Sequence, residues 1–247
     1  AVEAARRGCH VLVEKPMALT VSQCDSMIHA ASEADVTLMV SHNQRFMAHH
    51  RVAKEILETG RLGTPYLAHT VFGHQGPEFW SPEQEWYFQP AAAGMGVFGD
   101  LGYHKIDLLR WLLNQEVSNV QAMTQTFEKE TSLEDTVTCV LAFDGGALAT
   151  MQVSWVFRPD WQNSLTIRCE RGVIRVPTDV TEPVRVLEGT DPETIRETTH
   201  LQHSDDPSGW FGSIGAFVQA VMRGEPSPVP GREGKATIQA IRAVLEA

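Results

Sequence analysis

Two short apolar runs decide the fold class: HVLVEKP at residues 10–16 and VTLMVSHN at residues 36–43. Each begins with the length and apolar character of one buried parallel strand. Between them, Thr20 and Gln23 form a capping-box pattern, which predicts a helix that continues to about residue 34. A strand, a helix and a strand in this order predict a βαβ unit, and open α/β sheets bind ligands at the carboxyl ends of their strands.

Polar side chains follow both predicted strands at these carboxyl ends. Lys15 stands between an acid and Pro16, whose ring restrains the backbone and keeps the next helix from starting early. Asn43 and Arg45 follow the second strand and carry donors suited to a polyol or a carboxylate. We therefore expect a ligand near these residues, although Lys15 by itself is equally compatible with an ordinary exposed turn.

From residue 117 onward the pattern changes to a succession of strands. Turn residues at 144–146 and 170–172 predict hairpins, so the strands should be mostly antiparallel. Alternation within residues 136–143 predicts one face buried on helices and one face free to meet a partner. The strands are predicted at residues 117–127, 135–143, 147–155, 163–169, 172–176 and 183–188.

These patterns together predict an α/β fold with two parts. Residues 1–43 form an incomplete βαβ remnant of a larger parallel sheet. Residues 44–247 form an α/β domain with a large, mostly antiparallel sheet.

The segment from Gly99 to Leu113 is predicted to be a helix with catalytic side chains near its start. Asp100 and His104 are four residues apart, so they share one face of that helix. A carboxylate beside an imidazole can orient the ring and hold its proton, as general acid–base chemistry requires. The alternative is an acid placed at a helix N-terminus by the helix dipole alone.

Two further patterns, one of glycines and one of histidines, argue against a phosphate-binding loop in this segment and against a metal site. A G-x-G-x-x-G pattern at residues 94–99 follows no parallel strand and lies in no βαβ unit, so we interpret it as a flexible lead-in to the helix. The ten histidines include no H-E-x-x-H motif and no cluster with cysteine, so no metal site is predicted.

Composition narrows the class of protein. The net charge of −11 over 247 residues argues against a nucleic-acid partner, whose binding face would be basic. No apolar run is long enough for a membrane span. The four cysteines are dispersed, which is typical of reduced thiols in a cytoplasmic protein.

Several motifs in fixed order resemble the Gfo/Idh/MocA family of NAD(P)-dependent oxidoreductases. They are G-x-x-V-L-V-E-K-P at residues 8–16, a strand that ends in Asn43 and Arg45, and a G-x-L-G turn at residues 60–63. A G-x-G-x-x-x-D-x-G-x-H motif at residues 94–104 then leads into an I-D-L-L-R-W-L helix. The resemblance covers essentially the whole chain and implies a Rossmann domain followed by a domain with an open antiparallel sheet. It implies that residues 1–43 are a Rossmann-type remnant, the C-terminal part of the dinucleotide-binding domain, and that residues 44–247 serve substrate binding and oligomerisation.

The resemblance also implies roles for individual residues. Lys15 would lie between the nicotinamide and the substrate hydroxyl, and His104 would exchange the hydroxyl proton, with Tyr103 as a lesser alternative. Asp100 would bind substrate and tune the imidazole, and an aromatic loop at residues 80–88 would shape the pocket. The expected catalytic residues are Lys15, Asp100 and His104; the cofactor-binding residues are Glu14, Lys15, Pro16 and Asn43; the substrate-binding residues are Arg45, Trp86, Asp100 and His104.

One part of the family pattern is missing from the chain. Residues 1–247 contain neither the N-terminal strand with its glycine-rich turn nor the acid that reads the ribose, and we expect both to lie before residue 1. We expect the chain to be a fragment of a longer enzyme, the alternative being a natural remnant that has lost catalysis. By itself it should bind a dinucleotide poorly.

The expected function is that of a cytoplasmic dehydrogenase that uses NAD or NADP on a sugar, inositol or related polyol. One alternative is a relative that uses bound NAD in glycosidic cleavage, and another is a non-catalytic, sugar-responsive regulator. We also expect a homo-oligomer, a dimer or tetramer, built through the exposed sheet face, with no nucleic-acid or membrane partner.

Overall fold

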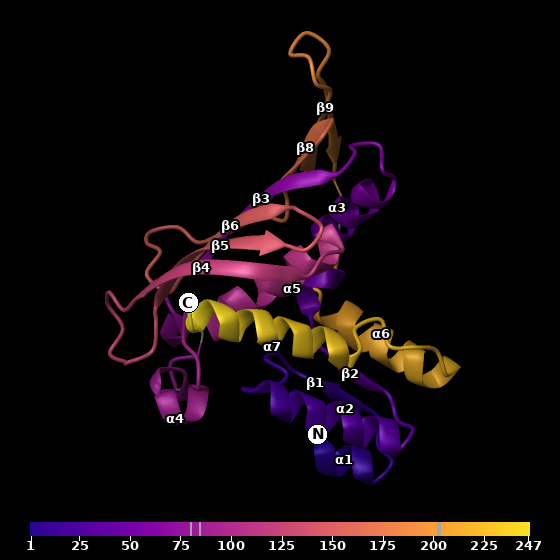
Figure 1. Ribbon diagram of the computed structural model, residues 1–247, viewed down its shortest axis with the longest axis vertical. Helices are drawn as coiled ribbons and strands as arrows, with labels where there is room; N and C mark the ends of the chain where they lie inside the picture. The colour runs from indigo at the N-terminus through magenta and orange to yellow at the C-terminus, as the bar shows by residue number, and fades with distance from the viewer. Residues whose placement is uncertain (80, 84, 202–203) are drawn as a thin grey trace.

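The fold combines a small parallel sheet with a large, mostly antiparallel one (Figure 1). The computed structural model describes residues 1–79, 81–83, 85–201 and 204–247. Within them, strands β1 and β2 form the small sheet, and strands β3 to β10 form an eight-stranded sheet. This architecture confirms the predicted α/β class.

The small sheet belongs to a βαβ unit near the N-terminus. Strands β1 (Val11–Val13) and β2 (Leu38–Val40) run parallel, and helix α2 (Val21–Glu33) connects them. The capping box is present as predicted, because the Thr20 hydroxyl accepts a bond from the Gln23 amide and the Gln23 side chain accepts one from the Thr20 amide. The short helix α1 (Val2–Arg6) packs against α2.

Helical segments connect β2 to strand β3 of the large sheet, and others connect β3 to helix α5. The 3-10 helix η1 (Asn43–Phe46) and helix α3 (Ala48–Glu58) precede strand β3 (Pro65–Gly73). After β3 come η2 (Pro77–Phe79), η3 (Glu85–Phe88), α4 (Pro90–Ala93), the π-helical turn η4 (Phe98–Gly102) and helix α5 (Tyr103–Leu113). Between β3 and η4 the described chain therefore consists of short helical turns joined by irregular segments.

The large sheet has the strand order β10-β9-β8-β7-β3-β6-β5-β4. Strand β3 pairs in parallel with β6 and antiparallel with β7, and every other pair is antiparallel. The later strands are β4 (Val117–Gln125), β5 (Thr136–Phe143), β6 (Leu148–Ser154), β7 (Gln162–Cys169), β8 (Gly172–Val176), β9 (Val184–Glu188) and β10 (Arg196–His200).

One face of this sheet is buried, as the alternation in β5 predicts. Val137, Cys139 and Leu141 are buried, whereas Thr138 and Val140 between them are exposed. The sequence did not reveal β10, because its residues are mostly exposed and only the pairing with β9 defines it.

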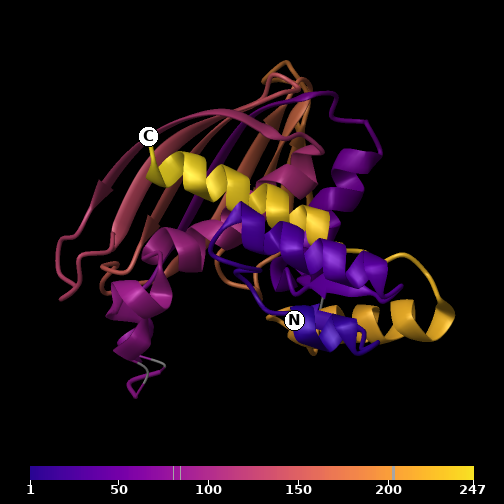
Figure 2. The ribbon, with the colours of Figure 1, turned by 60° about the horizontal axis from the view of Figure 1, so that its bottom comes forward.

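Helix α7 (Gly231–Leu245) joins the two sheets. It packs on α2 and β2 on one side and on α5 and β4 on the other. Figure 2 shows the large sheet curving over these helices, with α6 (Trp210–Arg223) projecting to one side. The domain boundary between residues 43 and 44 stays a prediction. Helix α7 lies late in the chain, yet it packs on elements from both predicted domains. No helix in the described ranges could span a membrane.

The glycine-rich lead-in to α5 fits closely around Glu134. The Glu134 carboxylate accepts bonds from the amides of Gly96 (3.0 Å) and Phe98 (3.1 Å), and its backbone oxygen accepts one from Val97 (2.9 Å). A Cβ at Gly96 would lie 2.1 Å from that backbone oxygen. These amides already donate to the Glu134 carboxylate, so they do not form a phosphate site. Glycine is required at position 96 because the backbone of Glu134 approaches it closely.

We therefore expect Gly96→Ala to lower the free energy of unfolding by about 1–3 kcal/mol, because neither backbone can move away without disturbing the sheet. The matched control is Gly215→Ala in α6, where a Cβ meets no atom within 4 Å. That change should stabilise the chain by about 0.5–1 kcal/mol. Urea unfolding of both variants tests the interpretation, and equal effects would contradict it.

Candidate active site

A cavity of about 840 Å³ lies where the small sheet meets the large one. Its inner end is lined by residues that follow β1 and β2 and by residues of the turn before α5. Of the predicted site residues, Glu14, Lys15, Pro16, Asn43, Trp86, Asp100 and His104 line the cavity. Residues that are about 90 positions apart in the sequence thus meet in one space.

Lys15 and Asp100 form an ion pair at the inner end. The Lys15 ammonium donates to Asp100 Oδ1 at 2.7 Å and to the Asp100 backbone oxygen at 3.0 Å. The side chains are only 14% and 11% exposed. The other carboxylate oxygen, Oδ2, accepts a bond from Trp155 Nε1 at 3.2 Å. Trp155 was not predicted as a site residue; the available signal was a tryptophan at a strand end, whose N–H needs a partner when buried.

His104 lines the cavity without a hydrogen-bonded partner among the described residues. Burial lowers the pKa of its imidazole well below the ordinary value, and the positive charge of Lys15 lowers it further. The ring is therefore neutral at pH 7 and can accept a proton.

This geometry corrects the expectation that Asp100 pairs with His104. Both side chains reach the same cavity, but the oxygens of Asp100 bond to Lys15 and Trp155 and not to the imidazole. A charged ammonium is a stronger partner for a carboxylate than a neutral ring. Tyr103, the lesser alternative, lies in the core, where its hydroxyl contacts His42 Nε2 at 2.9 Å.

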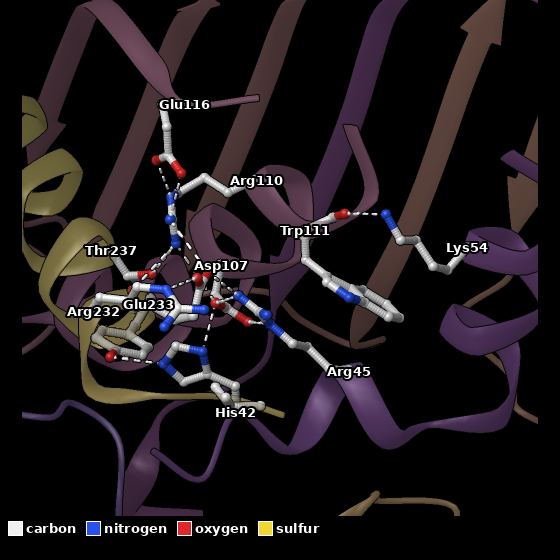
Figure 3. Close-up of polar contacts among 12 residues, drawn as sticks. His42, Arg45, Lys54, Asp107, Arg110, Trp111, Glu116, Arg232, Glu233 and Thr237 are labelled. Atoms are coloured by element: carbon white, nitrogen blue, oxygen red, sulfur yellow. Dashed lines mark hydrogen bonds and ion pairs between the residues drawn. The ribbon is translucent and has the colours of Figure 1, made fainter. Parts of the chain in front are cut away.

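Arg45 is also corrected, because it does not line this cavity. It belongs to a group of buried charged side chains (Figure 3). Its guanidinium donates to both oxygens of Asp107, at 2.8 and 2.6 Å, and to Glu233 at 3.0 Å. The side chain is only 7% exposed. Its donors are used within the protein, so Arg45 has a structural role here.

Asp107 is the centre of a buried ion cluster, shown in Figure 3. His42 Nδ1 lies 2.5 Å from its carboxylate, and Arg110 lies 3.9 Å away. Its interactions with His42 and Arg45, including a hydrogen bond from each, hold the pKa of Asp107 well below its usual value, so it stays ionised. Arg110 also bonds Glu116 at 2.6 and 2.7 Å. The cluster fixes α5, and with it the preceding turn, relative to η1 and α7.

The inner end fits the nicotinamide part of a dinucleotide. Asn43 donates from Nδ2 to the Ser208 backbone oxygen at 2.8 Å, while its Oδ1 is buried without a partner. A buried acceptor without a partner, on a residue that lines the same cavity as Lys15 and follows a parallel strand, suits a ligand with amide donors. In the described residues neither strand is followed by a glycine-rich turn, so no pyrophosphate cradle is identified.

Aromatic side chains also line the cavity. Trp86, which was predicted to bind substrate, stacks on Tyr87 with ring centroids 3.9 Å apart. Trp80, part of the predicted aromatic loop, lies outside the described residues. The sequence did not single out Gln44, His74, Trp161, Asn163 or Trp210, all of which line the cavity. They come from four different segments, and no local pattern joins them.

No group of three or more histidine, cysteine, aspartate or glutamate side chains within residues 1–79, 81–83, 85–201 and 204–247 is placed to hold a metal ion.

Two family models match the chain. Residues 1–42 match the oxidoreductase family with an NAD-binding Rossmann fold, and residues 50–175 match the GFO/IDH/MocA C-terminal domain.

Curated relatives and solved structures show the same similarity. The chain is 27% identical over 240 residues to myo-inositol 2-dehydrogenase of Thermotoga maritima, covering 95% of this chain and 69% of that protein. It is 34% identical over 148 residues to 1,5-anhydro-D-fructose reductase of Ensifer adhaerens, covering 59% of this chain and 43% of that protein.

Among solved structures, aldose-aldose oxidoreductase from Caulobacter crescentus in complex with glycerol matches with a TM-score of 0.86 and 25% identity, covering 100% of this chain and 72% of the other. Levoglucosan dehydrogenase in complex with NADH and levoglucosan matches with a TM-score of 0.87 and 21% identity, covering 99% and 73%. The chain therefore belongs to the GFO/IDH/MocA family of oxidoreductases, whose N-terminal domain is an NAD-binding Rossmann fold.

Proposed function

We propose that the protein is a dehydrogenase that transfers a hydride between NAD(P) and a hydroxyl or carbonyl group of a sugar, an inositol or a related polyol. The observation that carries the proposal is the meeting of Lys15, Asp100 and His104 in one cavity. The printed names of the relatives support the substrate class, since they include dehydrogenases of myo-inositol, levoglucosan and D-apiose.

The chemistry needs a base and a cation at the reacting oxygen. Oxidation of an alcohol removes a hydride from carbon and a proton from oxygen. NAD(P), when bound, supplies the hydride acceptor. The neutral His104 ring accepts the proton, and its lowered pKa keeps it unprotonated before the reaction. In the reverse direction the same ring returns the proton to the alkoxide.

Lys15 and Asp100 position the substrate oxygen. The ammonium of Lys15 stabilises negative charge that develops on this oxygen, and the carboxylate of Asp100 holds the ammonium in place. Trp155 fixes the carboxylate from the other side. Glu14, Pro16 and Asn43 complete the wall around Lys15, and we assign them to the nicotinamide end of the cofactor.

Replacing His104 by Asn should lower kcat by about 10²- to 10⁴-fold, because the side chain keeps its polarity but loses the base. The measurement is NAD(P)H formation by the full-length enzyme with a sugar and inositol panel, from pH 5 to 9. The native enzyme should keep its activity below pH 6.5, since the pKa of His104 lies well below that value. An unchanged kcat in the variant would remove His104 from this role.

Anionic sugars should be poor substrates. Among the described residues that line the cavity, the lysine and acidic side chains are Lys15, Glu14 and Asp100, and none is an arginine. Lys15 is already paired with Asp100, so a carboxylate or phosphate would enter without a free cation. We expect kcat/KM for sugar phosphates and uronic acids to be at least about tenfold below that of the neutral parent sugars. A preference for the anions would contradict the assignment.

We further propose a homo-oligomer, a dimer or tetramer, that forms through the exposed face of the large sheet. Leu67, Val140 and Leu148 are 44–48% exposed there and line a shallow cavity of about 340 Å³ together with Arg168. Apolar side chains grouped around a hollow on an open sheet face suit a second copy of the same face.

Leu148→Glu should therefore reduce the oligomeric mass of the full-length protein in light scattering, because it places two like charges in one interface. The matched control is Met222→Glu on α6, which is 81% exposed and lies off this face. The control should leave the mass unchanged. A native protein that is strictly monomeric would refute this interface.

A further inference from the structure

Lys105 is a buried lysine that the proposed reaction does not use. It follows His104 in helix α5, and its side chain is fully buried. Its Nζ has no hydrogen-bond partner among the described residues. The buried guanidinium groups of Arg45 and Arg110, by contrast, are paired with carboxylates. The ion cluster around Asp107 thus leaves this amine unpaired.

A buried amine without such a partner costs stability. Removing an ammonium from water is unfavourable unless an acid or a hydrogen-bond acceptor replaces the water. Phe72 offers only its ring, whose centroid lies 5.4 Å from Nζ, and a ring is a weaker partner than a carboxylate. A methionine would fill similar space without this cost, so the amine calls for a reason other than stability.

The ring of Phe72 connects the amine to the active site. Its centroid lies 6.0 Å from that of the His104 imidazole, and both residues line the cavity. A phenyl ring carries no ionisable or hydrogen-bonding group, so it screens a charge far less than water does. A positive charge on Nζ therefore acts on the imidazole.

The acids that face this site are paired with other cations. Asp107 favours protonation of the imidazole, but its carboxylate accepts two bonds from Arg45. Arg45 also donates to Glu233 of α7. In η4 the carboxylate of Asp100 accepts a bond from Lys15, so it offsets the charge of that lysine. The amine after His104 has no such counter-charge.

The neighbouring histidines add no charge at pH 7. Burial lowers the pKa of His42, and it lowers the pKa of His74, which packs on Phe72, to about 4. The pKa of His50 in α3 is lowered to about 3 by burial and by the charge of Lys105. Burial lowers the pKa of the Lys105 amine itself to about 7. Its charge thus appears as the pH falls toward the range in which an ordinary imidazole takes up a proton.

We propose that Lys105 is a positioning residue of the hydride-transfer site: its amine acts through the Phe72 ring and keeps the His104 imidazole neutral, ready to accept the substrate proton. The charge is present below about pH 7, where it opposes protonation of the free ring. It fades at higher pH, where the ring can hold the proton taken from the substrate. The inference rests on the proposed dehydrogenase function and adds a residue to it.

The test compares Lys105→Met with the native full-length enzyme by kcat/KM for NAD(P)H formation from pH 4.5 to 9. Methionine is similar in length to lysine but carries no charge. The acid limb of the profile should move up by about 0.5–1 pH unit, because the imidazole then gains a proton more easily. Acid limbs that coincide, or profiles that are both flat down to pH 4.5, would overturn the proposal.

The matched control is Lys54→Met. Lys54 in α3 also lies over an aromatic ring, that of Trp111, with Nζ 5.6 Å from the ring centroid, but it does not line the cavity. The acid limb should therefore stay where it is in the native enzyme. An equal shift in both variants would be a general effect of lost positive charge and would refute the role of Lys105.

Urea unfolding separates this role from a structural one. The pKa of Lys105 is about 7 in the folded chain and about 10.4 in an unfolded one, so the amine weakens the fold most below pH 7. Lys105→Met should raise the urea midpoint, and by more at pH 6.5 than at pH 9.5. A variant that unfolds more easily than the native protein at pH 6.5, or that does not fold, would assign Lys105 a structural role instead.

If no compound forms NAD(P)H, the dehydrogenase function fails, and NMR of protein labelled at histidine Cε1 decides the remaining question. The His104 resonance is identified by its absence from His104→Asn. Its titration midpoint should be about 0.5–1 pH unit higher in Lys105→Met than in the native protein. Equal midpoints, or no titration of His104 above pH 4.5 in either protein, would refute the action of Lys105 on the ring.

Discussion

The carboxylate of Asp107 is the constraint on which the rest of the active site depends. It is buried, and a buried charge is tolerated only when charged and hydrogen-bonding partners surround it. Its partners come from separate parts of the chain: Arg45 from η1 and Arg110 from α5, both of which also contact Glu233 of α7. These segments can meet the carboxylate only in one relative arrangement, so the cluster sets the position of α5 between the two sheets.

The position of α5 in turn determines what Lys15 can reach. Asp100 lies in η4 directly before this helix and His104 in its first turn, and Lys15 approaches from the end of β1. One buried pair, Arg45 with Asp107, thus supports a second and partly exposed pair, Lys15 with Asp100. The Arg45–Asp107 pair is not accessible to ligands and stabilises the fold. The Lys15–Asp100 pair faces the cavity, where it can act on a substrate.

The sequence predicted the parts of this protein that depend on neighbouring residues. The strands after residue 117 except β10, the capping box at Thr20 and helix α5 follow from local pattern, and the structure contains them. Contacts across the fold were less predictable. Asp100 was expected to pair with the histidine one turn away, but Lys15, 85 residues away, is its partner. Arg45 was predicted to bind substrate. Its acidic partners lie 62 and 188 residues away, and no local pattern identifies them.

The place of β3 bears on how the molecule folds. Strands β4 to β6 and strands β7 to β10 are two antiparallel groups, each connected by successive chain segments, and β3 lies between them. Each group can form from local contacts, but the complete sheet needs a strand whose partners follow it by about 80–100 residues, as in Leu67 with Leu148 and with Arg168. Such distant pairing slows folding more than it weakens the folded state, because the entropy of loop closure grows only slowly with length. The strand that completes the sheet is made early by the ribosome, and until it pairs with both groups each of them presents an open edge.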